Sequence, residues 1–336
     1  MEPSASSSFR KNRISALNQL SPWFTSILND EDHPVWFRCS QENAFFTEES
    51  IRLALSTWAD VLTEASLEKW AQFYDLPENS EETVGLVAAG NLPLVGLHDV
   101  LCVLLAGKRL QVKPSSSDRY LMVETLDFLN QLPEFSGRIS VVEQLTGFDR
   151  VIATGSNNTN RYFEYYFRNV PALLRGNRNS VAVLTGMETK EELTQLGRDV
   201  FTYFGLGCRS ISKLMVPRGY SFDALFEAWE SFASIKNHFK YFNNYEYHLA
   251  GYLVNQIPFL SNDWVILKED ENWSSPIGVV YYSFYDTLNE VETMLQSNQD
   301  KIQCIVGQGH LPLGTSQFPS LSDYADGVDT LAFLLS

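Results

Sequence analysis

From residue 83 onward, short apolar runs alternate with stretches in which apolar residues recur at helical spacing. Residues 83–89 read as a buried strand, and residues 94–106 carry leucines on one helical face before Gly107, a suitable residue for a helix C-cap. Residues 109–113 predict the next strand and residues 120–132 the next helix. This alternation is typical of βα units around a largely parallel sheet, so the sequence predicts an α/β fold.

The same alternation continues to the end of the chain. Three successive units favour a nucleotide-type domain, and a second domain could begin after residue 171. The first 80 residues are mostly helical by pattern. Further strands are expected at 139–142, 150–153, 181–184, 212–216, 264–267, 277–282 and 302–306, and further helices at 189–204, 225–233, 245–254 and 288–295.

Composition and charge exclude several classes of protein. Hydrophobic residues make up 44% of the chain and charged residues 20%, which is typical of a globular protein. Lys and Arg number 25 against 41 Asp and Glu, and the net charge of −16 repels nucleic acids and anionic membrane surfaces. No apolar run approaches the roughly 20 residues that span a bilayer. We therefore expect neither a nucleic-acid partner nor an integral membrane segment.

The spacing of the four cysteines argues against disulfides and structural zinc. Cys39, Cys102, Cys208 and Cys304 form no Cys-x-x-Cys pair.

The N-terminal residues are not followed by the apolar stretch that a secretory signal requires, so the expected compartment is the cytoplasm. In that reducing environment an isolated cysteine is a small buried hydrophobe or a reactive thiol.

Known metal and catalytic motifs are missing from the sequence. The five histidines show no His-x₃-His or HExxH spacing, so no metal site is expected. There is no Gly-x-Ser-x-Gly elbow, no GxxxxGK[ST] phosphate loop and no complete Gly-x-Gly-x-x-Gly after a strand. Serine hydrolases and P-loop NTPases are therefore set aside.

Cys208 lies in an unusual local sequence, Gly-Leu-Gly-Cys-Arg-Ser, just before a predicted strand. Glycines allow a substrate to approach the backbone closely, and exposed backbone N–H groups can stabilise a thiolate or an oxyanion. Cys102 and Cys304 fall inside a predicted helix and a predicted strand, where a buried apolar role is expected. From the residues alone, Cys208 is either a nucleophile or an ordinary partly buried thiol.

Three strand-to-helix turns carry polar residues that could bind a ligand. Asn91 could present its side-chain amide past the end of a strand, or cap the following helix. Lys113 and Ser115 suit a ribose or a phosphate, but also a solvated loop. Gly155 permits close approach and Ser156 could contact a phosphate at a helix N-terminus, although helix capping explains this turn equally well.

The ordered combination of these segments resembles the aldehyde dehydrogenase superfamily over about residues 83–336. AAGNLP with KRLQVKPSS is similar to its Asn-x-Pro segment and the following Lys-Pro-Ser strand, ATGS to its Thr-Gly-Ser turn, and GLGC to its nucleophile loop. SSPIGVVYYSFYDTLNEVETML is similar to its Gly-Pro-Val strand and helix. YADGVDTLAFLL resembles the C-terminus of the fatty acyl-CoA reductase branch associated with bacterial luminescence, the branch to which the whole pattern is most similar.

The resemblance implies an aldehyde dehydrogenase-like architecture of two α/β domains with largely parallel sheets and a cleft between them. It implies an N-terminal helical region and nucleotide cofactor domain over 1–173 and a catalytic domain with a nucleophilic cysteine over 174–312. A C-terminal segment over 313–336 follows. Because the chain is shorter than most relatives, elements used for oligomerisation could be missing.

The resemblance also implies a chemistry for Cys208. This residue would be the acylated nucleophile, and Asn91 would help the Cys208 backbone N–H hold the oxyanion. Where hydrolytic relatives carry a Glu that activates water, this sequence has Leu174, so hydrolysis of the acyl-enzyme is expected to be slow. An acyl-thioenzyme that resists water suits transfer between CoA and a hydride donor.

The implied cofactor is NADPH, with CoA as the leaving group of the substrate. Lys113 and Ser115 would bind the adenosine ribose and its phosphate, and Gly155 and Ser156 the pyrophosphate and the nicotinamide side. The family's Glu at the nicotinamide ribose has no clear counterpart, the nearest residues being Glu271 and Asn272, and Ser275 replaces its Gly.

These implications predict an acyl-CoA reductase that forms an aldehyde through an acyl-Cys208 thioester. The aromatic content, with 22 Phe and 15 Tyr, would permit an apolar acyl pocket or simply a well-filled core. The alternatives are an acyltransferase, a CoA-acylating aldehyde dehydrogenase working in the opposite direction, and a non-catalytic acyl- or cofactor-binding subunit. The expected partner is an acyl-CoA, a small-molecule substrate whose acyl group is expected to be fatty, and a homo-oligomer or an acyl-donor protein stays open.

Overall fold

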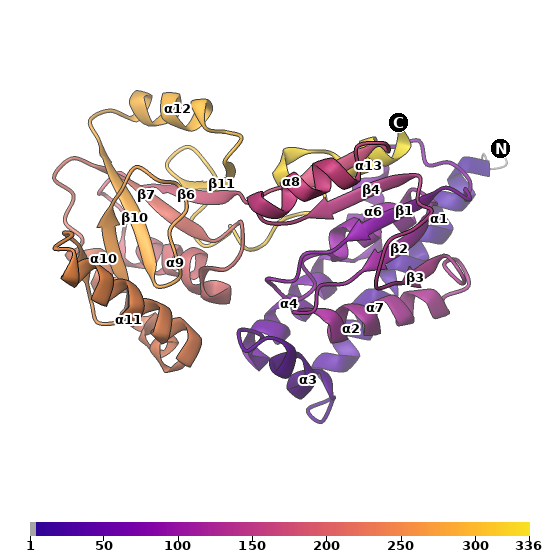
Figure 1. Cartoon of the computed structure of the whole chain (residues 1–336), viewed down its shortest axis with the longest axis horizontal. Coiled ribbons are helices and arrows are strands. Elements are labelled where there is room, and N and C mark those ends of the chain that lie inside the picture. Colours follow the sequence, from indigo (N-terminus) through magenta and orange to yellow (C-terminus); the bar gives the residue numbers. More distant parts are fainter. Residues whose placement is uncertain (1–4) are drawn as a thin grey trace. The chain divides into compact units, whose positions relative to one another are not determined.

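The structure is a computed structural model that describes residues 5–336, including all side chains except those of residues 5–7 and 157. The chain forms two compact units, one made of residues up to Gly176 together with Ser320–Ser336, the other of Asn177–Pro319 (Figure 1). Each unit contains its own largely parallel sheet. The predicted α/β class is therefore confirmed, with two sheets in one chain.

The first unit begins with a helical layer, as the apolar pattern predicts. Thr47 and Thr63 start two of these helices, because each side chain accepts a hydrogen bond from a backbone N–H three residues on. Apolar faces of the layer pack into one continuous core with the sheet. The helices are α1 (Ala5–Asn18), α2 (Leu20–Leu28), α3 (Val35–Glu42), α4 (Glu48–Val61) and α5 (Glu64–Ala71).

The sheet of the first unit has the order β3-β2-β1-β4-β5, and all its neighbouring strands are parallel. Since β1 lies at the centre and the order reverses beside it, the connecting helices fall on both faces, and Figure 1 shows α7 and α8 on opposite sides. The sequence pattern missed β5. The elements are β1 (Thr83–Val87), α6 (Leu97–Leu105), β2 (Arg109–Lys113), α7 (Arg119–Gln131), β3 (Ile139–Val141), β4 (Arg150–Thr154), α8 (Asn157–Tyr166) and β5 (Ala172–Arg175).

The C-terminal segment returns to this first unit through η3 (Ala325–Gly327) and α13 (Thr330–Leu335), which packs on α6. A directed chain of hydrogen bonds anchors it. The Trp70 indole N–H donates to the Tyr324 hydroxyl at 2.8 Å, and the Tyr74 hydroxyl donates to Asp329 at 2.7 Å. Because Tyr74 has used its only proton, the 2.7 Å contact between the two hydroxyls is a bond donated by Tyr324.

A buried ion pair also contacts the C-terminal segment, through Thr330. Arg175 on β5 and Asp99 on α6 are 3% and 5% exposed, and the guanidinium contacts both carboxylate oxygens at 2.8 and 2.6 Å. Its other terminal nitrogen donates to the Thr330 hydroxyl at 2.6 Å. The pKa of Arg175 is raised, since attraction to Asp99 outweighs the desolvation caused by burial.

The second unit has a six-stranded sheet of order β11-β6-β7-β10-β9-β8, parallel except for the short edge pair of β8 with β9. Three apolar clusters pack around it. Its elements are β6 (Asn179–Val183), α9 (Lys190–Phe201), η1 (Thr202–Gly205), β7 (Ile211–Pro217), α10 (Asp223–Trp229), η2 (Glu230–Asn237), α11 (Phe239–Val254), β8 (Leu260–Ser261), β9 (Ile266–Glu269), β10 (Val279–Tyr285), α12 (Leu288–Ser297) and β11 (Ile302–Gly307).

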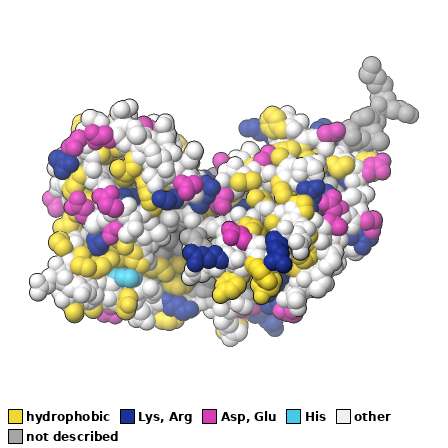
Figure 2. Space-filling view, turned by 45° about the horizontal axis from the view of Figure 1, so that its top comes forward, with side chains coloured by type: hydrophobic (Ala, Val, Ile, Leu, Met, Phe, Trp, Pro, Cys, Tyr) yellow, Lys and Arg dark blue, Asp and Glu magenta, His cyan; other side chains and the backbone are white. Residues whose placement is uncertain are grey.

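Over residues 5–336, no helix has both the length and the apolar character that crossing a bilayer demands. The face drawn in Figure 2 carries acidic and basic side chains interspersed with apolar ones.

The buried pair predicts a selective loss of stability. Replacement of Asp99 by Ala leaves the Arg175 charge buried without its partner, so the free energy of unfolding should fall by about 3 to 5 kcal/mol. Urea unfolding followed by circular dichroism measures this change. The control is Asp286→Ala, which breaks the exposed pair with Arg218 and should have little effect. Equal effects of the two variants would contradict a special role of the buried pair.

Candidate functional site

The chain enters the Cys208 region through a left-handed backbone segment. The capping box of Thr189 and Glu192 begins α9 as predicted, but the helix ends at Phe201 and not near residue 204. Tyr203 and Phe204 then have φ values of 54° and 59°, a region that side chains with a Cβ seldom occupy. Such strain persists only where the surroundings enforce it, and it is concentrated at functional sites.

Cys208 itself occupies a tight turn just before β7. The Ser210 N–H donates to the Gly207 carbonyl at 3.0 Å, and the Gly207 N–H donates to the Ser210 hydroxyl at 3.2 Å. Cys208 is partly exposed, whereas the other three cysteines are buried, as expected. Cys208 is therefore the thiol that a substrate could reach.

A loop near the end of the second unit supports this turn. The Arg209 side chain donates to the Ser316 carbonyl, and Gln317 donates to the Ser210 hydroxyl at 3.3 Å. The fully buried Asp199 on α9 holds the loop in turn, accepting the N–H groups of Gly314 at 2.6 Å and Ser316 at 2.9 Å. Burial raises the pKa of Asp199, and these hydrogen bonds only partly oppose it.

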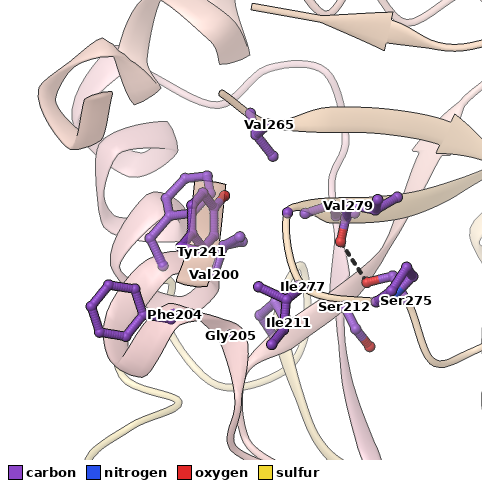
Figure 3. A pocket seen from close by; sticks show the side chains of 14 residues that line it. Val200, Phe204, Gly205, Ile211, Ser212, Tyr241, Val265, Ser275, Ile277 and Val279 are labelled. Carbon is purple, nitrogen blue, oxygen red and sulfur yellow. Dashed lines mark hydrogen bonds between the residues drawn. The ribbon is translucent and has the colours of Figure 1, made fainter. Parts of the chain in front are cut away.

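A pocket lies directly beside the turn (Figure 3). Residues on both flanks of Cys208 line it, namely Phe204 and Gly205 before the turn and Ile211 and Ser212 after it. About 310 Å³ of space, part of it open solvent, is bounded by these residues and by Val200, Phe201, Tyr241, Val265 and Ser275–Val280. Figure 3 shows Phe204 and Tyr241 on one side of the pocket and Ile211 and Ile277 on the other. Most of the lining residues are apolar, whereas polar atoms make up the larger part of the exposed wall.

Behind the pocket, β7 is tied to the segment that precedes β10. The Ser212 hydroxyl donates to the Trp273 carbonyl at 2.8 Å. The buried Lys213 ammonium donates to the Asp270 carbonyl and, at 2.6 Å, to the Ser283 hydroxyl, and burial lowers the pKa of Lys213 to about 8. These bonds order the wall that contains Ser275.

The residues near the expected ribose contact are engaged with other parts of the protein. Asn272 donates both its backbone and its side-chain N–H to Asp270, at 2.9 and 2.8 Å. The Ser275 hydroxyl donates to the Val279 carbonyl at 2.7 Å. Ser275 therefore shapes the start of β10 and one wall of the pocket.

In the first unit, the carboxyl ends of β1 and β2 bring two candidate segments together. Gly90 packs so closely on Ser115 that a Cβ at residue 90 would lie 2.3 Å from the Ser115 Cβ. Asn91 is exposed and does not cap α6, whose N-cap is Gly96. Lys113 is exposed at the end of β2, and the Ser115 hydroxyl accepts the Ser117 N–H at 3.3 Å.

The turn after β4 reaches the same edge of the sheet, because β4 runs parallel to β1 beside it. The exposed Ser156 caps α8 by accepting the Thr159 N–H at 3.2 Å. A Cβ at Gly155 would lie 2.9 Å from the Phe163 ring, so this glycine lets α8 approach closely. The interpretation of this turn as a helix cap is thus confirmed, and Ser156 is also exposed to solvent.

The five candidate cofactor and oxyanion residues of the first unit thus gather at one edge of its sheet, at the carboxyl ends of β1, β2 and β4. This is the edge where open parallel sheets bind ligands. Cys208 belongs to the second unit and precedes its strand, so it lies at the opposite, amino edge of that sheet.

Sequence reasoning missed the residues that support the Cys208 turn. Ser316 lies within a polar stretch and does not differ in pattern from a solvated residue. Asp199 did offer a signal, because it is an acidic residue on the apolar face of the helix predicted at 189–204. Across residues 5–336, no three His, Cys, Asp or Glu side chains are grouped as metal ligands would be.

Comparison with known proteins places this geometry in a known fold. No protein-family model matches the sequence, and no curated protein matches it. Solved structures do match. A putative aldehyde dehydrogenase from Burkholderia cenocepacia is similar over 89% of this chain and 75% of that chain, with a TM-score of 0.67 and 14% identity. An NAD-dependent aldehyde dehydrogenase from Sinorhizobium meliloti is similar over 92% and 73%, with a TM-score of 0.66 and 13% identity.

A third similar structure is aldehyde dehydrogenase 21 from Physcomitrella patens in complex with succinate. The match covers 89% of this chain and 73% of that chain, with a TM-score of 0.64 and 13% identity. The chain therefore has the aldehyde dehydrogenase fold, as the resemblance of its motifs implied.

The buried Asp199 predicts a pH-dependent stability. Because its pKa is higher in the folded protein than the roughly 3.9 of an unfolded chain, ionisation is less favourable after folding. Its contribution to the free energy of unfolding is thus greatest below about pH 4 and is lost as the pH rises through the folded pKa. Urea unfolding gives the free energy of unfolding of the wild type and of Asp199→Asn between pH 4 and 8. As the pH rises, the wild type should lose stability relative to Asp199→Asn. A difference independent of pH would contradict this assignment.

Proposed function

We propose that the protein is an acyl-CoA reductase, which converts an acyl-CoA to the aldehyde through a thioester on Cys208 with NADPH as the reductant. One observation carries the proposal: a partly exposed cysteine sits in a tight turn whose two flanks line a pocket built mostly from apolar residues. The aldehyde dehydrogenase fold of the chain and the order of its motifs support it.

The first chemical step is acyl transfer. The Cys208 thiolate attacks the thioester carbonyl carbon, and the negative charge moves to the carbonyl oxygen. Collapse of this tetrahedral species breaks the bond to the CoA sulfur, which leaves as a thiolate and takes a proton from solvent. In the proposal, the Cys208 backbone N–H and the Asn91 side chain stabilise the oxyanion, the latter role resting on the motif resemblance.

The acyl-enzyme must then survive until it is reduced. Leu174 on β5 offers no carboxylate at the position where hydrolytic relatives are expected to carry their water-activating Glu. Without a general base, attack of water on the thioester is slow. Apolar side chains in the pocket, such as Ile211 and Ile277, would offer contacts to an acyl chain.

The edge formed by β1, β2 and β4 has features that suit a dinucleotide. Lys113 is an exposed cation, and Ser156 is an exposed hydroxyl at the N-terminus of the ten-residue α8. In the proposal, Lys113 and Ser115 hold the adenosine ribose and its phosphate, and Gly155 and Ser156 border the pyrophosphate. The bound cofactor would supply a hydride to the carbonyl carbon of the acyl group. Collapse of the resulting oxyanion would then break the bond to the Cys208 sulfur, which would leave as a thiolate and release the aldehyde.

A labelling experiment tests the proposal. The purified protein is incubated with a series of acyl-CoAs, with and without NADPH, and adducts are located by intact and peptide mass spectrometry. We expect an acyl group on Cys208 that persists in buffer and disappears with NADPH oxidation. Cys208→Ala should abolish the adduct and lower turnover by at least about a thousandfold. Cys39→Ala, which removes a buried thiol of the first unit, serves as the control.

Other outcomes separate the alternative functions. An adduct that NADPH leaves in place would indicate an acyltransferase. Formation of acyl-CoA from aldehyde, CoA and NADP⁺ as the faster direction would indicate an acylating aldehyde dehydrogenase. If no acyl-CoA labelled Cys208, the reductase proposal would be wrong and a non-catalytic binding protein would take its place.

A pocket variant tests whether the acyl chain occupies the pocket. In Ile277→Trp, the larger side chain fills space beside the turn. The kcat/KM for dodecanoyl-CoA should fall by about tenfold or more, while that for acetyl-CoA should change by less than about threefold, since each buried methylene contributes about 0.8 kcal/mol. Val254→Trp, on the exposed end of α11, is the control. Equal losses for both substrates would rule out this pocket as the acyl site.

A further inference from the structure

We propose that Ser180 is a positioning residue for the Cys208 turn, with its hydroxyl holding the Cys208 carbonyl and being oriented in turn by the thiol of Cys304. The inference rests on the proposed function in so far as it treats Cys208 as the nucleophile. Ser180 is the second residue of β6, between Asn179 and the apolar residues 181–183, and its side chain is fully buried.

The hydrogen bonds around Ser180 determine where its proton points. Its hydroxyl donates to the Cys208 carbonyl oxygen at 2.9 Å. The same oxygen accepts the Cys304 N–H at 3.2 Å and lies 3.1 Å from the Cys304 sulfur. A hydroxyl has one proton and two lone pairs. Since the proton is used on Cys208, the Cys304 thiol is the donor in the third contact.

The sheet is irregular on both sides of Ser180. Along β7, Ser180 pairs with Ile211 while the next residue, Val181, pairs with Lys213, so β7 carries one extra residue here. Along β11, the paired residues advance from 302 to 305 while β6 advances from 179 to 181, so β11 also carries an extra residue. Bulges of this kind redirect side chains and backbone groups, and they are frequent beside active sites.

The double irregularity explains why a serine is needed at this position. The bulge in β11 takes the Cys304 N–H out of the regular ladder, and a buried N–H without an acceptor is costly. The Ser180 oxygen accepts that N–H, and its proton reaches across to the turn before β7. One side chain thus satisfies backbone groups from two neighbouring segments.

The bond to the Cys208 carbonyl matters for acyl transfer in particular. Cys208 is the second residue of the Gly207–Ser210 turn, and fixing its carbonyl fixes the peptide plane that follows it. That constraint limits rotation about the Cα–C bond and so holds the Cys208 Cα, its side chain and its N–H in one orientation. An oxyanion donor must be placed accurately, because a misplacement of about 1 Å can lower a rate a hundredfold.

Two reagents that need neither CoA nor NADPH test this role. p-Nitrophenyl acetate acylates a thiol through an oxyanion, whereas iodoacetamide alkylates it without one. For Ser180→Ala we expect the rate of Cys208 acylation to fall by about tenfold or more, and the rate of Cys208 alkylation to change by less than about threefold. Peptide mass spectrometry assigns both reactions to Cys208. Their pH profiles report the thiol titration separately.

Variants of Cys304 test the same network without removing Ser180. Cys304→Ser keeps a donor at this position and should retain acylation to within about twofold, whereas Cys304→Ala should lose part of the rate. Ser50→Ala, which deletes a buried hydroxyl on α4 in the first unit, is the matched control and should leave both rates near the wild-type values.

Several results would contradict the positioning role of Ser180. Wild-type acylation rates in Ser180→Ala, or equal losses with both reagents, would overturn the positioning role, as would identical behaviour of the two Cys304 variants. A Cys208 that reacts with neither reagent in the wild type would also overturn it. If the expected pattern appears while no acyl-CoA labels Cys208, only the reductase proposal fails.

Discussion

A parallel sheet requires the chain to cross back to the same edge before every strand, and this constraint decides where the polar residues of this protein gather. In the first unit, the residues that follow β1, β2 and β4 meet at the carboxyl edge, which brings Asn91, Lys113, Ser115 and Ser156 onto one side of the sheet. In the second unit the residues that precede the strands do the same at the amino edge. The Cys208 turn before β7, Ser275 before β10 and the bulged start of β11 are neighbours for that reason.

Much of this arrangement is predictable from the sequence, because the strand residues that face the core must be apolar. Leu110 and Val112 alternate with polar residues over 109–113, and this run predicts β2 with its observed bounds. The Thr189 capping box predicts the start of α9. The pattern fails where local preference and structure diverge. The helix predicted to reach residue 204 ends at Phe201, since Tyr203 and Phe204 adopt a left-handed conformation that their side chains disfavour. The strand β5 was missed because its sequence, Ala-Leu-Leu-Arg, contains no β-branched or aromatic residue and so shows no local preference for a strand.

The candidate site likewise contains residues that the sequence indicated and residues that it did not. Cys208 stands out in the sequence because glycines precede it, and its partial exposure agrees with that distinction. The groups that hold its turn could not be predicted, since their partners are distant in sequence. Ser180 meets Cys304 across 124 residues and Asp199 meets Ser316 across 117. Ser180 lies just before the strand predicted at 181–184, where a serine gives no signal. The two bulges beside it depend on strand register, which a single sequence does not encode locally.

The return of residues 320–336 to the first unit bears on how the chain is made. A ribosome delivers all of the second unit before it delivers Tyr324, Asp329 and Thr330. Until then, Arg175 and Asp99 lack the third member of their buried cluster, and Trp70 and Tyr74 lack their hydroxyl partner. The second unit is contiguous in sequence and can fold during synthesis, whereas the first unit completes its core only after residues 320–336 have been made. Of these two units, the one that begins first is therefore completed last.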